Sequence, residues 1–253
     1  MKKKILLLTA AMLTSIMLVS CKTGPTKQQL AFKSVESKTH SSVTPATQTG
    51  SWWMPRQDAV NARLKEGNVD LLYIGDSITH FFERTGRQVW DKYYAPRNAV
   101  NMGFSGDRTQ HVLWRLDNSD FSNVKPKLAI VMIGTNNSNG RDNTAEEIAD
   151  GIIAICSRLR TRLPETKILL LAIFPRGQRP SAQRQKNAQA SEIASQIADN
   201  KTIFYLDINK NFLTDDGELT RDIMPDFLHP SARGYQIWAD AIEPKVAQLM
   251  REK

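Results

Sequence analysis

Residues 69–77 read Val-Asp-Leu-Leu-Tyr-Ile-Gly-Asp-Ser, a short run rich in β-forming apolar residues that stops at a glycine and a polar turn. Apolar side chains dominate the run instead of alternating with polar ones, which is typical of a strand buried on both faces of a parallel sheet. Four more runs of this kind cover residues 99–102, 128–133, 167–173 and 202–206. The pattern predicts a five-stranded, mainly parallel sheet.

Helical stretches lie between these runs. Thr144 is followed three residues later by Glu147, the spacing of a capping box that starts a helix. Apolar residues then recur on one helical face, at Ile148, Ile152, Ile155, Cys156 and Leu159. Residues 182–199 and 231–250 have the pattern of two further helices. The alternating order predicts an α/β fold, a three-layer α/β/α sandwich, in which Cys156 is a core residue and not a reactive thiol.

Polar motifs follow the first three predicted strands, and a fourth precedes the last helix. They are Gly75-Asp76-Ser77, Gly103-Phe-Ser-Gly106-Asp107, Gly134-Thr-Asn136-Asn137 and Asp226-Phe-Leu-His229. Sites in open parallel sheets form where the carboxyl ends of the strands meet their loops. We therefore expect the motifs to meet in one site.

The residue types in these motifs suit acyl transfer. Ser77, on a strand-to-helix turn, can act as a nucleophile once a base takes its proton. His229 is the candidate base, and Asp226, three residues earlier, can orient its imidazole. Gly106 can bring a backbone N–H close to an oxyanion, and the side-chain amide of Asn136 can supply another donor.

Other residues compete for these roles. His80 shares the helix start of Ser77, and His111 has Asp107 four residues before it, a spacing that equally describes a helix surface contact. Asp76 adjoins the nucleophile, where we expect it to brace the turn instead of taking part in the chemistry.

Three arginines and two tryptophans also have two interpretations. Arg108, Arg176 and Arg179 either meet an anionic substrate or lie solvated on loops. Trp52 and Trp53 either form a platform for a sugar or, as we favour, pack the start of the domain. The sequence has no H-E-x-x-H motif and no clustered carboxylates, so no metal or other cofactor is expected.

The four motifs together resemble the SGNH (GDSL-type) hydrolase family, which is named for its Ser, Gly, Asn and His. The resemblance implies a flavodoxin-like SGNH fold and a carboxylic ester hydrolase. It places the nucleophile on Ser77 and the acid–base pair on Asp226 and His229. The implied oxyanion hole consists of the N–H groups of Ser77 and Gly106 and the amide of Asn136.

Longer blocks resemble the platelet-activating-factor acetylhydrolase branch of this family. They are Asp107-Arg-Thr-Gln-His-Val-Leu-Trp-Arg-Leu116, Lys125-Pro-Lys127, Gly134-Thr-Asn-Asn137, Pro175-Arg-Gly177 and Arg184-Gln-Lys-Asn187. This similarity covers residues 68–250. Asn137 departs from the aspartate that many family members carry, although the branch also has asparagine there. Because the catalytic subunits of the branch dimerise, the resemblance leaves a homodimer open.

The formal charge of +8 is concentrated near the N-terminus. Lys2, Lys3 and Lys4 supply three charges, and residues 22–50, with four lysines and one glutamate, supply a net three more. Residues 51–253 keep +2. A strongly basic face for nucleic acid is therefore not expected.

The N-terminus has the pattern of a targeting signal. Lysines precede an apolar run over residues 5–19, and Leu-Val-Ser-Cys at 18–21 resembles the lipobox of bacterial lipoproteins. The resemblance implies cleavage before Cys21, lipidation of its thiol and an extracytoplasmic place in the cell envelope, with the outer membrane weakly preferred. An uncleaved anchor and a plain secretion signal are the alternatives. We expect a signal peptide at 1–20, a lipidated Cys21 with a flexible, Ser/Thr-rich tether to residue 50, and the hydrolase domain at 51–253.

Apolar Ile78 and Leu228, next to the candidate nucleophile and base, favour a small acyl pocket and hence acetyl esters. An enzyme in the envelope meets acetylated polysaccharide, so a carbohydrate O-acetylesterase is the preferred function. A phospholipid or lysophospholipid esterase is the alternative, and a non-catalytic binding module for carbohydrate or a partner is a third possibility. A nucleotide binder is disfavoured because no G-x-G-x-x-G loop follows a strand.

Overall fold

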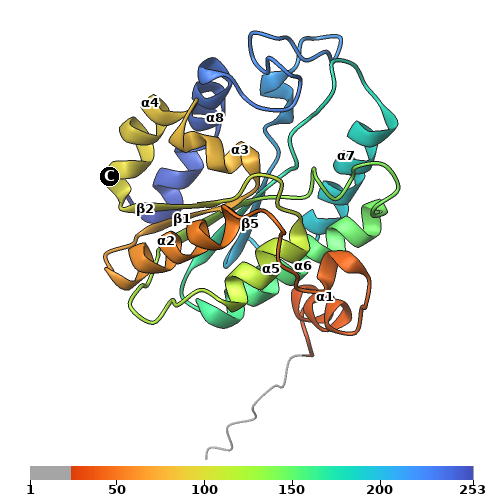
Figure 1. Ribbon diagram of the computed structural model, residues 1–253. Helices are drawn as coiled ribbons and strands as arrows, with labels where there is room; N and C mark the ends of the chain where they lie inside the picture. Colours follow the sequence, from red (N-terminus) through yellow and green to blue (C-terminus); the bar gives the residue numbers. More distant parts are fainter. Residues whose placement is uncertain (1–23, 253) are drawn as a thin grey trace, which may run out of the picture.

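One parallel sheet forms the centre of the molecule (Figure 1). The structure, a computed structural model, describes residues 24–252. Its five strands have the order β2-β1-β3-β4-β5, and every neighbouring pair is parallel. The strands are β1 (Leu71–Gly75), β2 (Ala99–Gly103), β3 (Leu128–Met132), β4 (Lys167–Leu171) and β5 (Ile203–Leu206). This arrangement confirms the predicted sheet.

Helices fill the connections between the strands. The α-helices are α1 (Lys27–Glu36), α2 (Trp53–Lys65), α3 (Ser77–His80), α4 (Arg87–Val89), α5 (Thr109–Asp117), α6 (Ala145–Arg162), α7 (Ala182–Ser195) and α8 (Ala232–Met250). The shorter helical turns are η1 (Ser41–Val43), η2 (Phe81–Glu83), η3 (Trp90–Tyr94), η4 (Ala95–Arg97) and η5 (Asn209–Phe212). Within residues 24–252, no helix is both long and apolar enough to cross a membrane.

Each face of the sheet has its own apolar core. Successive side chains of a strand point to opposite faces. Leu72 and Ile74 accordingly join a core with α2, α5, α6 and α7, while Leu71 and Tyr73 join a core with α3 and α8. Apolar residues on both faces of the same strand explain why the predicted runs were continuous. The two helical layers confirm the three-layer sandwich.

The strand order predicts that a ligand binds at the carboxyl end of β1. The chain leaves β1 for β2 on one side and later returns to β3 on the other, and ligands in open α/β sheets bind where the order reverses in this way. Gly75 and Gly103 end the adjacent strands β1 and β2. A side chain at either position would collide with α3, so the two glycines allow α3 to lie against the strand ends.

The N-terminal segment differs from the sequence prediction. Residues 22–50 were expected to be a flexible tether, but from Thr26 onward the chain is folded onto the domain. Thr26 caps α1 with a complete capping box, and α1 packs against α6, as Figure 1 shows at the lower right. Val35 of α1 is buried and belongs to the main core. The tether prediction is therefore wrong for residues 26–50.

Polar contacts explain why composition failed to predict this segment. His40 binds Asp150 of α6 at 3.0 Å, and Ser42 is fully buried with its hydroxyl 2.8 Å from His40 Nδ1. The Thr109 hydroxyl donates to the Ser42 carbonyl at 2.7 Å. Disorder was predicted from the low content of apolar residues in this segment. Specific hydrogen bonds hold the segment in place of apolar burial. Cys21 and the expected signal peptide at 1–20 lie outside the described residues.

Replacing Gly151 by Ala should separate this segment from α6. Alanine favours a helix interior over glycine by about 1 kcal/mol. A Cβ at Gly151, however, would lie 2.5 Å from Thr109 Oγ1 and 2.7 Å from the Ser42 carbonyl oxygen. We expect a net loss of about 1–3 kcal/mol in the free energy of unfolding, measured by urea denaturation. Ser157→Ala, on the same helix, is the control. A Gly151→Ala protein more stable than the wild type would contradict the close packing.

Candidate active site

The turn after β1 presents Ser77 at the first position of α3. Asp76 caps this helix, and its Oδ1 accepts a hydrogen bond from the Ile78 N–H at 2.9 Å. Ser77 is mostly buried, with 7% of its surface exposed. Asp76 thus braces the turn, as the sequence analysis expected, and the bracing fixes the direction of the Ser77 side chain.

Ser77, His229 and Asp226 form a continuous hydrogen-bonded chain. The Ser77 hydroxyl lies 2.9 Å from His229 Nε2, and His229 Nδ1 lies 2.6 Å from Asp226 Oδ2. The three predicted residues therefore meet, although Ser77 is 152 positions from His229 in the chain. This is the geometry in which a histidine can take a serine proton while a carboxylate holds the other ring nitrogen.

The loop that carries His229 is organised by Asp226. The Oδ1 atom of Asp226 accepts the backbone N–H groups of Leu228 at 3.1 Å and His229 at 2.8 Å. Partial burial alone would raise the pKa of the Asp226 carboxyl, but the hydrogen bonds from His229 outweigh it and hold the pKa below its ordinary value. The carboxylate therefore stays ionised and available to stabilise a positively charged imidazole.

Two contacts connect this loop to the rest of the site. The hydroxyl of Tyr235, in α8, donates to the Ile78 carbonyl at 2.6 Å and so joins the helix after His229 to the helix of Ser77. Phe227 has a left-handed backbone with a φ of 58°, and its carbonyl accepts the Gly177 N–H at 2.8 Å. A left-handed non-glycine residue costs about 1–2 kcal/mol and is retained where its surroundings over-determine it.

The predicted oxyanion donors lie on the two neighbouring loops. Gly106 has a φ of 77°, which few other residues adopt, and its N–H donates to no group in the described part of the chain. The Asn136 side-chain amide donates one hydrogen to the Asp107 carbonyl at 2.9 Å. Its second hydrogen has no acceptor among residues 24–252. His80 Nδ1 accepts the Ser105 N–H at 3.3 Å, so the Gly106 loop lies against α3.

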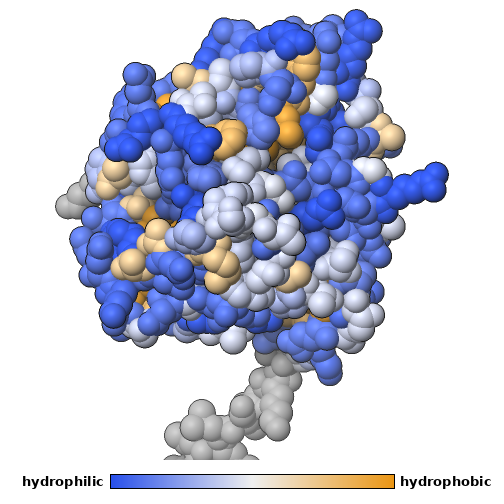
Figure 2. Space-filling view, viewed as in Figure 1, coloured by the Kyte–Doolittle hydropathy of each residue, from blue (hydrophilic) through white to orange (hydrophobic). Residues whose placement is uncertain are grey.

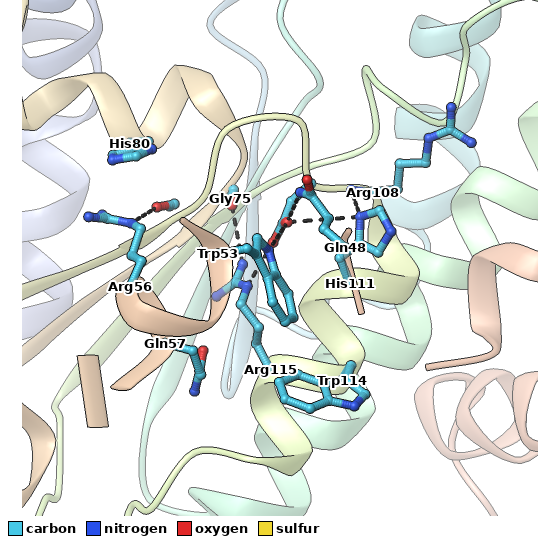
Figure 3. A network of polar contacts seen from close by, with 12 residues as sticks. Gln48, Trp53, Arg56, Gln57, Gly75, His80, Arg108, His111, Trp114 and Arg115 are labelled. Atoms are coloured by element: carbon cyan, nitrogen blue, oxygen red, sulfur yellow. Dashed lines mark hydrogen bonds and ion pairs between the residues drawn. The ribbon is translucent and has the colours of Figure 1, made fainter. Parts of the chain in front are cut away.

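A buried polar network holds the Gly106 loop from below (Figure 3). The Asp107 carboxylate accepts from Arg115 Nε at 2.7 Å, from Trp53 Nε1 at 2.8 Å and from the Gln48 amide. Asp107 and Arg115 are fully buried, and the Arg115 guanidinium lies 4.0 Å from the centre of the Phe104 ring. Gln48 also donates to the Ser105 carbonyl at 3.1 Å. The residues on both sides of Gly106 are thereby fixed.

The rival histidines occupy other positions. Burial lowers the pKa of His80 to about 4, with a further contribution from Arg56, so this imidazole is neutral and serves as an acceptor for the Gly106 loop. His111 Nδ1 accepts the Arg108 N–H at 3.0 Å and lies 3.9 Å from Asp107. In the part of the chain that the structure describes, the hydroxyl of Ser77 is bonded to His229 and to neither of these rings.

The structure also gives the partners of the three arginines and the burial of the two tryptophans, Cys156 and Asn137. Each of the three arginines has a partner in a loop. Arg108 pairs with Asp142, and Arg179 pairs with Glu218. Arg176 donates to the Thr135 carbonyl and to the Asn139 side chain.

Trp53 is fully buried and packs the domain, whereas Trp52 is 41% exposed. Cys156 is buried in the core, which raises the pKa of its thiol to about 12. Asn137 is also buried, where it holds Thr109, Gln110 and Asn143.

The two residues predicted to limit the acyl pocket both join one apolar cluster of the core. Ile78 is buried, and Leu228 is partly buried against the same apolar cluster. Their backbones lie next to the candidate nucleophile and base, as the sequence predicted. Among residues 24–252, no three His, Cys, Asp or Glu side chains are grouped so that they could hold a metal ion.

The sequence did not predict the supporting roles of Gln48, Arg115 and Tyr235. Arg115 stands eight positions after Asp107, and the available signal was a basic residue among the apolar residues of α5, soon after an acidic residue that precedes the helix. Nothing in the local sequence marks Gln48, because its partners are 57 and 59 positions away. Tyr235 is equally remote from Ile78, which lies 157 positions earlier.

Comparison with known proteins agrees with this geometry. Residues 73–237 match the GDSL-like Lipase/Acylhydrolase family. Human platelet-activating factor acetylhydrolase IB subunit alpha2 is 36% identical over 201 residues, which cover 79% of this chain and 86% of that protein.

Two solved structures share the fold. A GDSL-like lipase from Bacteroides thetaiotaomicron has a TM-score of 0.59 at 20% identity, over 77% of this chain and 97% of its own. An acetylxylan esterase from Geobacillus stearothermophilus has a TM-score of 0.54 at 20% identity, over 74% and 96% respectively. The chain belongs to the GDSL-like lipase/acylhydrolase family and is a carboxylic ester hydrolase.

Proposed function

We propose that the protein is a serine esterase that removes acetyl groups from carbohydrate by a Ser-His-Asp mechanism. The observation that carries this proposal is the unbroken chain from the Ser77 hydroxyl through His229 to Asp226, at 2.9 and 2.6 Å. In this hydrogen-bonded triad Ser77 has the position of the nucleophile, His229 that of the base and Asp226 that of the group that orients the base.

The first half of the reaction acylates Ser77. The Ser77 oxygen attacks the ester carbonyl carbon while His229 Nε2 takes its proton. The carbonyl oxygen becomes an oxyanion, which accepts hydrogen bonds from the N–H groups of Ser77 and Gly106 and from the free amide hydrogen of Asn136. Ionised Asp226 stabilises the imidazolium at Nδ1. The carbon–oxygen bond to the alcohol then breaks, and His229 gives its proton to the departing oxygen.

The second half releases the acyl group. A water molecule transfers a proton to His229 and attacks the acyl carbon, and the same donors stabilise the second oxyanion. The bond to the Ser77 oxygen breaks as His229 returns its proton to Ser77. The products are a carboxylic acid and the free enzyme.

A small acyl group fits the residues beside the nucleophile. Ile78 is buried next to Ser77, and Leu228 precedes His229 in the loop that Asp226 organises. Rigid apolar side chains at these two places limit the space for the acyl chain, which supports acetyl over longer groups.

The alcohol is a carbohydrate in our first proposal and a phospholipid in the second. The second candidate is favoured by the 36% identity to a platelet-activating factor acetylhydrolase subunit. The first is favoured by the proposed place in the envelope, and the fold is also that of an acetylxylan esterase. A homodimer remains a prediction of the resemblance.

The proposed lipid on Cys21 would hold the enzyme close to a membrane. The folded chain begins at the α1 cap, Thr26, so only residues 22–25 separate it from Cys21. Four residues span at most about 14 Å when fully extended. With so short a connection, the proposed lipid would hold the enzyme near the membrane surface.

Replacing Ser77 by Ala should abolish esterase activity. The variant removes the attacking oxygen, and we expect the hydrolysis rate of p-nitrophenyl acetate to fall by about 10³-fold or more. Acetate release from acetylated xylan, pectin and sialic acid, compared with acetylated phospholipids, identifies the alcohol. Rapid cleavage of p-nitrophenyl butyrate and longer esters would contradict the small pocket, and a Ser77→Ala protein with full activity would contradict the mechanism.

Replacing Gln48 by Ala should reduce kcat with little change in KM. The substitution removes the two hydrogen bonds that hold Ser105 and Asp107 around Gly106. We expect about a tenfold loss in kcat for p-nitrophenyl acetate, less than the 10²–10³ typical of a deleted oxyanion donor. Gln28→Ala is the control, because Gln28 binds the distant Ile197 carbonyl. Equal kcat in both variants would show that Gln48 does not position the loop.

Asp76 should make stability depend on pH. Burial, with the negative charge of Asp107, raises the pKa of its carboxyl from 3.8 to about 7. Between these values the folded state holds a proton that the unfolded state has lost, so this group lowers stability as pH rises. His80, whose pKa falls to about 4, has the opposite effect on stability. Between about pH 4 and its ordinary pKa of 6.5 the unfolded state binds a proton that the folded state does not, so this group raises stability as pH rises.

A comparison of Asp76→Asn with the wild type isolates the first effect. Asparagine keeps an acceptor for the Ile78 N–H but does not titrate. We expect the free energy of unfolding of the variant, relative to the wild type, to rise between about pH 4 and pH 7 and then to level off. Urea denaturation across this range measures it, with the exposed Asp58→Asn as control. A constant difference between variant and wild type would show that Asp76 is ionised throughout.

A further inference from the structure

A row of aromatic rings leads from the candidate base to the protein surface. The rings of His229 and Phe81 have centroids 5.1 Å apart, those of Phe81 and His80 6.0 Å, and those of His80 and Trp52 5.9 Å. Phe81 and His80 belong to the segment that follows Ser77, whereas Trp52 comes from the N-terminal side of α2. The row therefore connects two distant parts of the chain beside the active site.

Trp52 is held in place although much of it is exposed. Its ring stacks on His80 with an angle of 28° between the planes, and Phe104 lies 6.2 Å away. A Cβ at Gly50 would lie 2.8 Å from Trp52 Nε1, so the glycine makes room for the indole. His80 and Phe104 lie beside the ring, and 41% of the residue's surface is exposed. Trp52 therefore presents part of a fixed aromatic ring to solvent.

Charged groups lie beside the two rings next to Trp52: the Arg56 guanidinium is 5.0 Å from the centre of the Phe104 ring, and Glu83 Oε2 is 3.9 Å from His80 Nε2. Arg56, one helical turn after Trp52, forms two hydrogen bonds with Glu83, at 3.0 and 2.7 Å, and the Glu83 side chain is 40% exposed. Figure 3 shows Arg56 near His80, to one side of the buried network. Figure 2 shows that the displayed face is mostly hydrophilic, with small hydrophobic patches and an area of intermediate hydropathy near its middle.

We propose that the exposed part of the Trp52 ring binds a sugar ring of the alcohol half of the substrate. The inference rests on the proposed function, because His229 delivers its proton to the leaving alcohol and the alcohol must therefore lie on the side of His229 and Phe81. A pyranose presents a flat array of C–H groups that packs on an aromatic face. Its equatorial hydroxyls point outward, where the exposed Glu83 carboxylate, which Arg56 holds in place, can accept hydrogen bonds from them.

This chemistry distinguishes a sugar from a lipid chain. An acyl or alkyl chain is buried best in an aliphatic groove, since its affinity comes from apolar area removed from water. The row instead offers ring faces, with an ion pair at the border. Trp53, the adjacent tryptophan, is fully buried and donates to Asp107, so the two tryptophans have separate roles.

Three variants test the site with two substrates. Trp52→Leu keeps an apolar side chain but removes the ring, Trp52→Phe keeps a ring, and Met54→Ala removes an exposed apolar side chain nearby, 43% accessible, that is outside the row. Trp52 makes no side-chain capping bond to α2, so its replacement leaves the helix start intact. We expect Trp52→Leu to raise KM for acetylated xylo-oligosaccharide about tenfold, as loss of an aromatic contact of about 1.4 kcal/mol would.

The same variant should leave kcat/KM for p-nitrophenyl acetate within about twofold of the wild type, because this substrate has no sugar. Trp52→Phe should restore most of the affinity, and Met54→Ala should behave as the wild type. An unchanged KM for the oligosaccharide in Trp52→Leu overturns the proposal. So does a loss of binding to phosphatidylcholine vesicles in that variant without a change toward the oligosaccharide, which would make Trp52 a membrane contact.

Calorimetry separates failure of this inference from failure of the proposed function. Binding of unacetylated xylo-oligosaccharide to the wild type needs no hydrolysis. Binding that Trp52→Leu loses supports the sugar site even where no glycan ester is cleaved. If the wild type hydrolyses p-nitrophenyl acetate but binds no oligosaccharide, the sugar site is contradicted. The esterase mechanism is then still supported.

Discussion

The buried ion pair between Asp107 and Arg115 is the constraint on which the site depends. Neither side chain is exposed, and removing one partner of such a pair typically destabilises a protein by about 3–5 kcal/mol because the other charge stays buried. The loop between β2 and α5 therefore cannot shift without separating the charges. Arg115 also reaches the Gly75 carbonyl at 3.4 Å, so one side chain connects the loop of Gly106 with the turn that presents Ser77. Nucleophile and oxyanion donors share this single anchor.

The candidate base is held in a different way. Asp226 and His229 are three positions apart, partly exposed, and bonded to each other through both backbone and side chain. Their loop is joined to the nucleophile helix by the Tyr235 hydroxyl and to the Gly177 turn by the Phe227 carbonyl. The oxyanion side is thus fixed by buried charge and the base side by short-range hydrogen bonds.

Local patterns could predict the sheet and the polar ends of its strands, because burial on both faces leaves continuous apolar runs such as residues 69–74. Ser77, Asp226 and His229 stand in recognisable motifs, so their meeting could be expected before any geometry. Gln48 could not be found in this way, since its partners are contributed by the fold and its own neighbours are Ser, Thr and Pro. The same reason explains the failed tether prediction: composition registers apolar residues, whereas His40 and Ser42 hold their segment by hydrogen bonds to α6 and its neighbours.

That failure changes where the functional unit begins. Gln48 holds the loop of Gly106, and Trp52, four positions later, lies against His80, so the stretch across residue 50 contacts both the candidate active site and the proposed sugar site. A domain boundary at residue 51 would divide these two contacts, although both rest on the same β2–α5 loop through Ser105 and Phe104. Because α1 and η1 fasten the preceding chain to α6, the position of Gln48 is set by tertiary packing and not by its neighbours in sequence. Residues 26–50 are therefore part of the folded domain that carries the candidate active site.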